Sequence, residues 1–151
     1  MKILVSACLL GVCSRYDGTG VLHEELAKLL DDHILIPICP EIYGGLSTPR
    51  PPAEIQADRR VINAEGVDVT FQYERGAAEA LKLVRFYDCK LAILKERSPS
   101  CGSGVIYDGT FTRTKIPGDG KTAELLKAHG IPVIGESQIK EYFVKKEPDA
   151  F

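Results

Sequence analysis

The sequence lacks the features of several large classes of protein. Its 151 residues contain no apolar run as long as a membrane span, and the opening stretch MKILVSACLLGVCSRYDG turns polar too soon for a signal peptide. Acidic and basic residues are mixed along the chain, with a formal net charge of -2, so no basic footprint for the phosphates of duplex nucleic acid is present. We therefore expect a cytoplasmic protein that binds neither membranes nor duplex nucleic acid.

Cysteine is too scarce for a fold held together by disulfides. The five cysteines are scattered and odd in number, which is typical of thiols in a reducing compartment, where some can serve as ligands. The chain has 44% hydrophobic residues and the length of one ordinary domain. We expect a single domain over residues 1–151 whose apolar core needs no disulfide or metal.

Short apolar runs alternate with helical patterns along the chain. Strands are predicted at 2–7, 34–39, 90–96 and 131–135, and helices at 23–32, 73–88, 121–130 and 137–143, the last begun by Ser137. Residues 60–70 read as two short extended runs around a turn, and Asp108-Gly109 between extended runs predicts a β-hairpin. Solid apolar strands separated by helices indicate an α/β fold, an open and mostly parallel sheet with helices on both faces. This is a Rossmann- or flavodoxin-like three-layer sandwich with a small β-hairpin addition.

Three cysteines follow predicted strands. Cys8 follows the first strand, Cys39 closes the second, and Cys101 comes shortly after the third. Ligands of such sheets bind at the carboxyl ends of the strands, so we expect the three thiols to converge there. Cys101 lies in SPSCGSG, where free backbone amides would favour a thiolate and suit the sulfur ligands of a metal cluster. The alternative that Cys8 and Cys39 are small buried hydrophobic residues stays open.

Other motifs do not complete a known site. The spacing from Cys8 to Arg15 is one residue too long for a tyrosine-phosphatase loop, and PGDGKTAE lacks the first glycine of a P-loop. The histidines have no triad-like company for a cysteine protease. Cys13 shares a loop with Cys8 at a spacing that fits no common zinc knuckle, and Cys89 is most simply a core residue.

Four stretches resemble the thiouracil desulfidase family, the TudS-like proteins long described as a domain of unknown function. They are SACLLG...RYDG, CPEIYGGLSTPRPPAEI, LKERSPSCGSGVIYDGTF and AELLKAHGIPVIGE, in order from about Ser6 to Glu136. The resemblance implies an iron-sulfur enzyme that converts the C=S group of a thiolated pyrimidine such as 2-thiouracil to C=O without net redox chemistry. It places Cys8, Cys39 and Cys101 on the three ligands of a [4Fe-4S] cluster.

The resemblance also suggests how the reaction would run. With three cysteine ligands, one iron has no protein ligand and can act as a Lewis acid that binds the substrate sulfur and accepts sulfide. Glu41, two residues after Cys39, is the expected acid/base, and Ser98 is the second expected catalytic residue. Turn chemistry around Pro99 is an alternative explanation for Ser98. Further residues expected to bind substrate or to lie behind the ligands are Ser6, Arg15, Asp17, Arg50 and Ser100.

The remaining residues of the cysteine-led loop at 39–54 leave several interpretations open. Its glycines allow the backbone to approach a bulky cofactor, and its prolines stiffen the loop and hold a site preformed. Arg50 and Arg15 either pair with Glu54 and Asp17 or neutralise an anionic cluster. Two other functions use the same cysteines: a structural zinc module with Cys13 as the fourth ligand, and an iron-sulfur carrier or sensor without catalysis.

Overall fold

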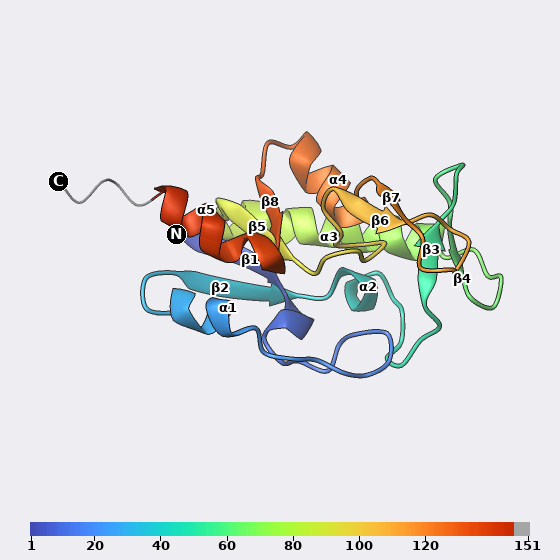
Figure 1. Ribbon diagram of the computed structural model, residues 1–151, viewed down its shortest axis with the longest axis horizontal. Coiled ribbons are helices and arrows are strands. Elements are labelled where there is room, and N and C mark those ends of the chain that lie inside the picture. The colour runs from blue at the N-terminus through green and yellow to red at the C-terminus, as the bar shows by residue number, and fades with distance from the viewer. Residues whose placement is uncertain (147–151) are drawn as a thin grey trace.

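A parallel four-stranded sheet forms the centre of the computed structural model, which describes residues 1–146, without the side chains of 145 and 146 (Figure 1). The strand order is β2-β1-β5-β8, and all three pairings are parallel. The bounds are β1 Lys2–Ser6, β2 Ile34–Ile38, β5 Leu91–Leu94 and β8 Val133–Gly135. All four strands lie where the continuous apolar runs predict them.

Helices cover both faces of this sheet. On one face, α3 (Thr70–Tyr87) and α4 (Lys121–Ala128) pack on every second strand residue, including Leu4 and Leu94. On the other, α1 (Glu24–Leu29) and α5 (Ile139–Lys146) pack on the alternate residues, including Ile3 and Ile93. Successive residues of a strand therefore belong alternately to one of two apolar clusters, as a sheet buried on both faces requires. The predicted three-layer α/β sandwich is confirmed.

Two short antiparallel ribbons extend the sandwich. β3 (Ala53–Ile55) pairs with β4 (Val61–Asn63), and β6 (Val105–Tyr107) pairs with β7 (Lys115–Pro117). They share a third apolar cluster with α3, which includes Ile55, Tyr73 and Ile106. Figure 1 shows both ribbons at the end of α3 that is distant from the chain termini.

The predictions for these ribbons need correction. The hairpin at Asp108-Gly109 exists, but its second strand begins only at Lys115 because the intervening segment is held as a loop by hydrogen bonds to its backbone. In the 60–70 stretch only Val61–Asn63 forms a strand, and its partner is β3, while Asp68 makes just an isolated bridge with Ile62.

The helix ends show one further correction. α4 ends as predicted, with Gly130 at a φ of 79° and the Ile131 N–H bound to the Leu126 carbonyl. The last helix begins at Ile139, after the short turn η2 (Glu136–Gln138), and the Ser137 N–H donates to Glu96, so Ser137 is not the cap. Within residues 1–146, no helix has both the length and the apolar character needed to cross a membrane.

Candidate functional site

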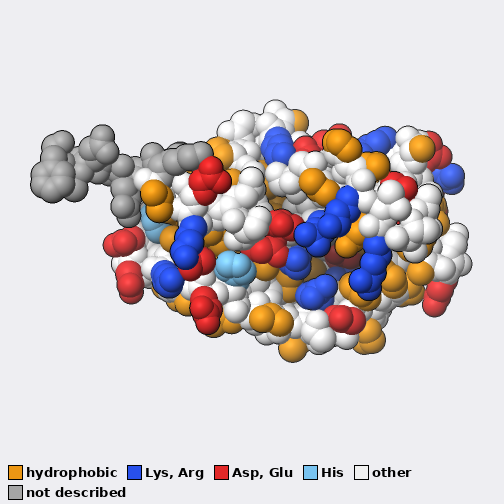
Figure 2. All heavy atoms as spheres, in the orientation of Figure 1, with side chains coloured by type: hydrophobic (Ala, Val, Ile, Leu, Met, Phe, Trp, Pro, Cys, Tyr) orange, Lys and Arg blue, Asp and Glu red, His pale blue; other side chains and the backbone are white. Residues whose placement is uncertain are grey.

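A cavity of about 470 Å³ lies at the carboxyl ends of β1, β2 and β5, and three thiols line it. Cys8 lies in the short turn η1 (Ala7–Leu9) that follows β1, Cys39 directly follows β2, and Cys101 lies in the turn after β5. Figure 2 shows the mouth of this cavity as a hollow with Lys and Arg side chains around it. The parallel strand order thus brings together cysteines that are far apart in the sequence.

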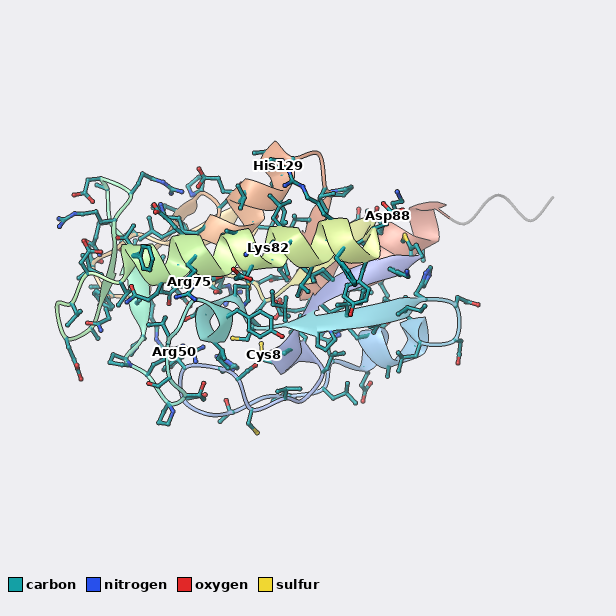
Figure 3. All side chains as sticks on the ribbon, turned by 180° about the vertical axis from the view of Figure 1, so that it is seen from behind. Cys8, Arg50, Arg75, Lys82, Asp88 and His129 are labelled. Atoms are coloured by element: carbon teal, nitrogen blue, oxygen red, sulfur yellow. The ribbon has the colours of Figure 1, made fainter. Side chains whose placement is uncertain are left out.

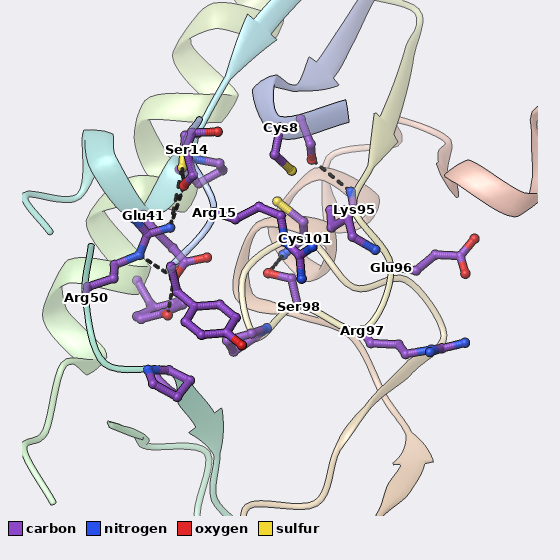
Figure 4. Close-up of a pocket in the computed structure, with 18 of the residues that line it drawn as sticks. Cys8, Ser14, Arg15, Glu41, Arg50, Lys95, Glu96, Arg97, Ser98 and Cys101 are labelled. Atoms are coloured by element: carbon purple, nitrogen blue, oxygen red, sulfur yellow. Dashed lines mark hydrogen bonds and ion pairs between the residues drawn. The ribbon is translucent and has the colours of Figure 1, made fainter. Parts of the chain in front are cut away.

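The turn that carries Cys101 is built around the Ser98 hydroxyl. Ser98 Oγ accepts the N–H of Ser100 at 3.1 Å and the N–H of Cys101 at 3.0 Å. The Gly102 N–H donates to the Ser98 carbonyl at 2.9 Å, and a Cβ at Gly102 would lie only 2.7 Å from that oxygen. Sterically, the SPSCG sequence can therefore close into a tight turn only with glycine after the cysteine. Figure 4 shows the Cys8 and Cys101 sulfur atoms pointing toward one another.

Cys39 is held by a buried arginine. The Cys39 thiol donates to the Ser14 carbonyl at 3.6 Å, and Arg50 Nη2 lies 2.8 Å from the same oxygen and 3.9 Å from Cys39 Sγ. Arg50 is only 8% exposed, and its Nη1 donates to the Ser47 carbonyl and to Thr48 Oγ1. Figure 3, seen from behind, shows Arg50 and Cys8 beside α2 (Pro40–Tyr43), on the same side of α3. One guanidinium thus ties the 39–54 loop to the segment after Cys8.

Glu41 lies in α2 and is fixed by two donors. Its Oε1 accepts Arg50 Nε at 3.1 Å and the Tyr73 hydroxyl at 2.5 Å. Arg50 therefore pairs with Glu41 and not with Glu54, which corrects one of the two expectations for this arginine. Glu54 accepts the backbone N–H groups of Gly109 and Phe111 instead.

The remaining sequence-predicted residues divide into two groups. Ser6 and Arg15 line the cavity together with Glu41, Ser98 and Arg50. Ser6 Oγ accepts the Lys95 N–H at 2.8 Å.

Two predicted residues, Asp17 and Ser100, lie outside the lining of the cavity. Asp17 is exposed, and its Oδ1 accepts hydrogen bonds from the N–H and the hydroxyl of Thr19. This is the usual bond of an aspartate in a turn, because its short side chain reaches the backbone two residues later. Ser100 is fully buried, with its hydroxyl 2.9 Å from that of Thr122, so it links the Cys101 turn to α4. Neither residue lines the cavity. Cys13 is exposed and also outside it, while Cys89 is a core residue as predicted.

Sequence reasoning missed several residues that line the cavity: Tyr73, Lys95, Arg97, Tyr107, Phe111 and Arg113. Lys95 and Arg97 come just before the SPSC motif in LKERSPSC, and this nearness is a signal by which the sequence could have identified them. Tyr73 comes from α3 and Phe111 from the loop after β6, and no spacing pattern connects them with the cysteines.

Burial raises the pKa of two of the thiols that line the cavity. Desolvation, together with the nearby Cys39, raises the pKa of Cys8 to about 11, although Lys95 and Arg15 oppose the shift. Desolvation raises the pKa of Cys101 to about 12 against a hydrogen bond with Ser6. A positively charged group bound between these thiols would reverse both shifts, because a coordinating thiol is deprotonated outright.

The thiols surround a space and do not meet at a point. Within the described part of the chain, no group of three His, Cys, Asp or Glu residues is placed to hold a single metal ion. The three cysteine side chains instead form part of the wall of one cavity, with the cationic Arg15, Arg50 and Lys95 beside them. This arrangement offers soft sulfur donors and positive charge to a group larger than one ion.

Comparison with known proteins connects this site with a family. The closely similar "Uncharacterized protein YbbK" of Bacillus subtilis (strain 168) is 45% identical over 148 residues, which cover 92% of this chain and 98% of that protein. A solved structure described as the [4Fe-4S]-dependent thiouracil desulfidase TudS is 46% identical, covers 95% of this chain and 96% of its own, and superposes with a TM-score of 0.88. The model of the 2-thiouracil desulfurase family matches residues 3–138. The resemblance seen in the cysteine loops is thereby confirmed, and the chain belongs to the 2-thiouracil desulfurase family.

Proposed function

We propose that this chain holds a [4Fe-4S] cluster through Cys8, Cys39 and Cys101 and removes sulfur from a thiolated pyrimidine, converting C=S to C=O. The observation that carries the proposal is the convergence of these three thiols on one cavity that Glu41 and Ser98 also line. Family membership and the 46% identity to TudS, which is described as [4Fe-4S]-dependent, support both the cofactor and the reaction.

The donor set suits such a cluster. Thiolate sulfur is the usual protein ligand of iron-sulfur clusters, and the cavity of about 470 Å³ is much larger than a single ion needs. Arg15, Arg50 and Lys95 would offset the negative charge of a thiolate-ligated cluster. Because Cys13 lies outside the cavity, the geometry supports three cysteine ligands and not four.

The overall reaction is a hydrolysis without electron transfer. The oxygen of water becomes the new C=O oxygen, the C=S sulfur leaves as sulfide, and the protons of water are redistributed between sulfide and the site. A cluster bound by three thiolates would supply one iron without a protein ligand, a Lewis acid toward the substrate sulfur. The chain must supply the proton transfers.

The contacts of Glu41 support a part in these transfers, and those of Ser98 support a part in holding the substrate. The Glu41 carboxylate lines the cavity and can accept a proton from water, and the hydrogen bonds from Tyr73 and Arg50 fix its orientation. The Ser98 hydroxyl already accepts two backbone N–H groups, so its own proton is left to donate to the substrate. We assign Glu41 the role of acid/base and Ser98 that of a hydrogen-bond donor to the pyrimidine.

The setting follows from the same chemistry. The five cysteines of the chain are free thiols, and a site made of thiols persists in the reducing cytoplasm. We therefore place the protein there, with a small thiolated pyrimidine as its partner and with neither a membrane nor duplex nucleic acid involved.

The test is anaerobic reconstitution followed by turnover. The wild-type chain should take up about four irons and four sulfides and release sulfide from 2-thiouracil. Cys8→Ala, Cys39→Ala and Cys101→Ala should each lose most of the iron and all turnover. Cys13→Ala, with the exposed thiol removed, is the matched control and should behave as wild type.

Three outcomes would count against the proposal. Zinc without sulfide in the purified chain would indicate a structural metal module. Iron and sulfide without turnover would indicate a carrier or sensor. Loss of the cluster in Cys13→Ala would show that the ligand set is wrong.

A further inference from the structure

Three residues that line the cavity have a left-handed backbone. They are Arg97, Phe111 and Arg113, with φ angles of 65°, 58° and 61°. Only two other non-glycine residues among 1–146, Arg59 and Asp88, have positive φ, and both lie away from the cavity. A left-handed conformation is unfavourable for a residue with a Cβ and persists where the surrounding structure enforces it, often at ligand clamps. In the described part of the chain, most of the non-glycine residues with this unfavourable backbone thus line the cavity.

The loop that carries Phe111 is held in place by β3 and its flank. Glu54 Oε1 accepts the N–H groups of Gly109 at 3.0 Å and of Phe111 at 3.2 Å. Gln56 Nε2 donates to the Gly109 carbonyl at 3.1 Å. Hydroxyl contacts of 2.6 and 2.7 Å connect Thr110, Thr112 and Thr114 within the loop. These bonds prevent the backbone at Phe111 from relaxing, so the ring is presented in a fixed position.

Among the described residues, the packing of the core does not account for the position of the Phe111 ring. It lines the cavity, remains 40% exposed, and belongs to none of the three buried apolar clusters. Within residues 1–146, the close aromatic pairs involve other rings. An aromatic face at the wall of a cavity is a stacking surface for a flat ring, and base–aromatic stacking is a strong and general contact.

We propose that Phe111 stacks on the ring of the substrate and selects a planar, unsaturated pyrimidine. The inference rests on the proposed function, since it assumes that the substrate occupies this cavity. It assigns recognition of the ring to the β6–β7 loop, while Glu41, Ser98 and the three cysteines act on the C=S group. Phe111 is a specificity-determining residue and takes no part in proton transfer.

The left-handed backbone allows a sharp test. Phe111→Gly removes the ring and also relieves the unfavourable φ, so the fold should not lose stability. We expect the KM for 2-thiouracil to rise about tenfold, as the loss of one stacking contact predicts, with kcat changed less than about twofold. Phe111→Tyr, which keeps an aromatic ring, should have the wild-type KM. Asp88→Gly is the matched control, because it makes the same backbone change at a φ of 56° outside the cavity.

A second measurement separates stacking from other effects and does not depend on turnover. Uracil and 5,6-dihydrouracil are titrated by calorimetry into the reconstituted protein, since the second compound lacks a planar ring. The wild-type protein should bind uracil about tenfold more tightly, and in Phe111→Gly this preference should fall to about one.

The possible failures are distinguishable. If the wild-type protein releases sulfide from 2-thiouracil but Phe111→Gly keeps both its KM and its preference for uracil, the stacking inference is wrong and the proposed function stands. If the wild-type protein neither releases sulfide nor binds uracil, both fall.

Discussion

Tyr73 couples the long helix α3 to the candidate acid/base. Its side chain is 1% exposed, and its hydroxyl lies 2.5 Å from Glu41 Oε1. Desolvation, and then the charge of Glu41, raises the pKa of Tyr73, so the hydroxyl stays protonated and donates. Arg50 supplies the second donor to the same oxygen. The orientation of Glu41 therefore depends on a residue 32 positions away in the sequence.

Replacing Tyr73 by Phe tests this coupling. The ring still fills its place in the core, but Glu41 loses one of its two donors, so we expect about 2 kcal/mol lower stability, as for a hydrogen bond to a charged group. A less well fixed Glu41 should lower kcat about tenfold without changing the iron content. Urea unfolding, iron analysis and steady-state kinetics measure these effects. Tyr87→Phe, at the far end of the same helix, is the control; a Tyr73→Phe enzyme as active and stable as wild type would disprove the coupling.

For single residues, the sequence pointed to site residues where they belong to short motifs of neighbouring residues. The cysteine loops pointed to Cys8, Cys39 and Cys101, and the structure places all three at one cavity. Asp17 and Ser100 do not line the cavity: Asp17 bonds to Thr19 within its own turn, and Ser100 lies behind Cys101 with Thr122 as a partner that sequence spacing does not reveal. Tyr73 and Phe111 were missed because only tertiary packing brings α3 and the β6–β7 loop to the cavity.

At the level of elements, the position of α2 depends on two glycines. A Cβ on Gly76 of α3 would lie 1.9 Å from the Pro40 carbonyl oxygen, and one on Gly44 would lie 1.9 Å from the Gln72 carbonyl oxygen. The backbones of the two helices therefore touch, which places Cys39 and Glu41 against the site. Figure 3 shows α2 lying along α3, near Arg75.

Gly76→Ala should push α2 away from α3. Alanine favours a helix over glycine by about 1 kcal/mol, but a Cβ at this distance from a backbone atom forces the helices apart, and overpacking of this kind costs typically 1–3 kcal/mol. We expect a net loss of stability and a larger loss of reconstituted iron, because Cys39 moves with α2. Ala78→Gly on the exposed face of α3 is the control, since it destabilises the helix without touching α2. Equal iron uptake by Gly76→Ala and wild type would contradict this account.

Elements were predictable in proportion to the apolar pattern that they carry. The four core strands and α3 follow from continuous or helix-spaced apolar residues, and the structure confirms them. β3, β4 and β7 are short and each includes a polar or charged residue, so none forms a continuous apolar run, and their pairing depends on loops. Ser137 resembles a helix cap, but the Glu96 carboxylate takes its N–H and the helix starts later.

On the scale of the whole molecule, the apolar core and the candidate site occupy different places. Two clusters fill the faces of the sheet from Leu4 to Leu126 and from Ile3 to Ile139, and the cavity lies at the strand ends. The core is made of residues that need no ligand to pack. We therefore expect the chain to fold without the cluster, in agreement with its composition.

A cluster bound by Cys8, Cys39 and Cys101 would nevertheless stabilise the native state, because it joins three segments that only the folded chain brings together. A ligand that binds only the native state stabilises it by about 2.7 kcal/mol at a hundredfold excess over its Kd. For a protein of this size that corresponds to a rise in Tm of about 5–10 °C. Anaerobic calorimetry of reconstituted and chelator-treated protein should show this difference in Tm. At about room temperature both forms should be folded and have the same far-UV circular dichroism spectrum. Cys39→Ala should show no rise and Cys13→Ala the full rise. Equal Tm values with and without iron in the wild-type protein would mean that the thiols do not ligate a cluster, and an unfolded chelator-treated protein would mean that the core depends on it.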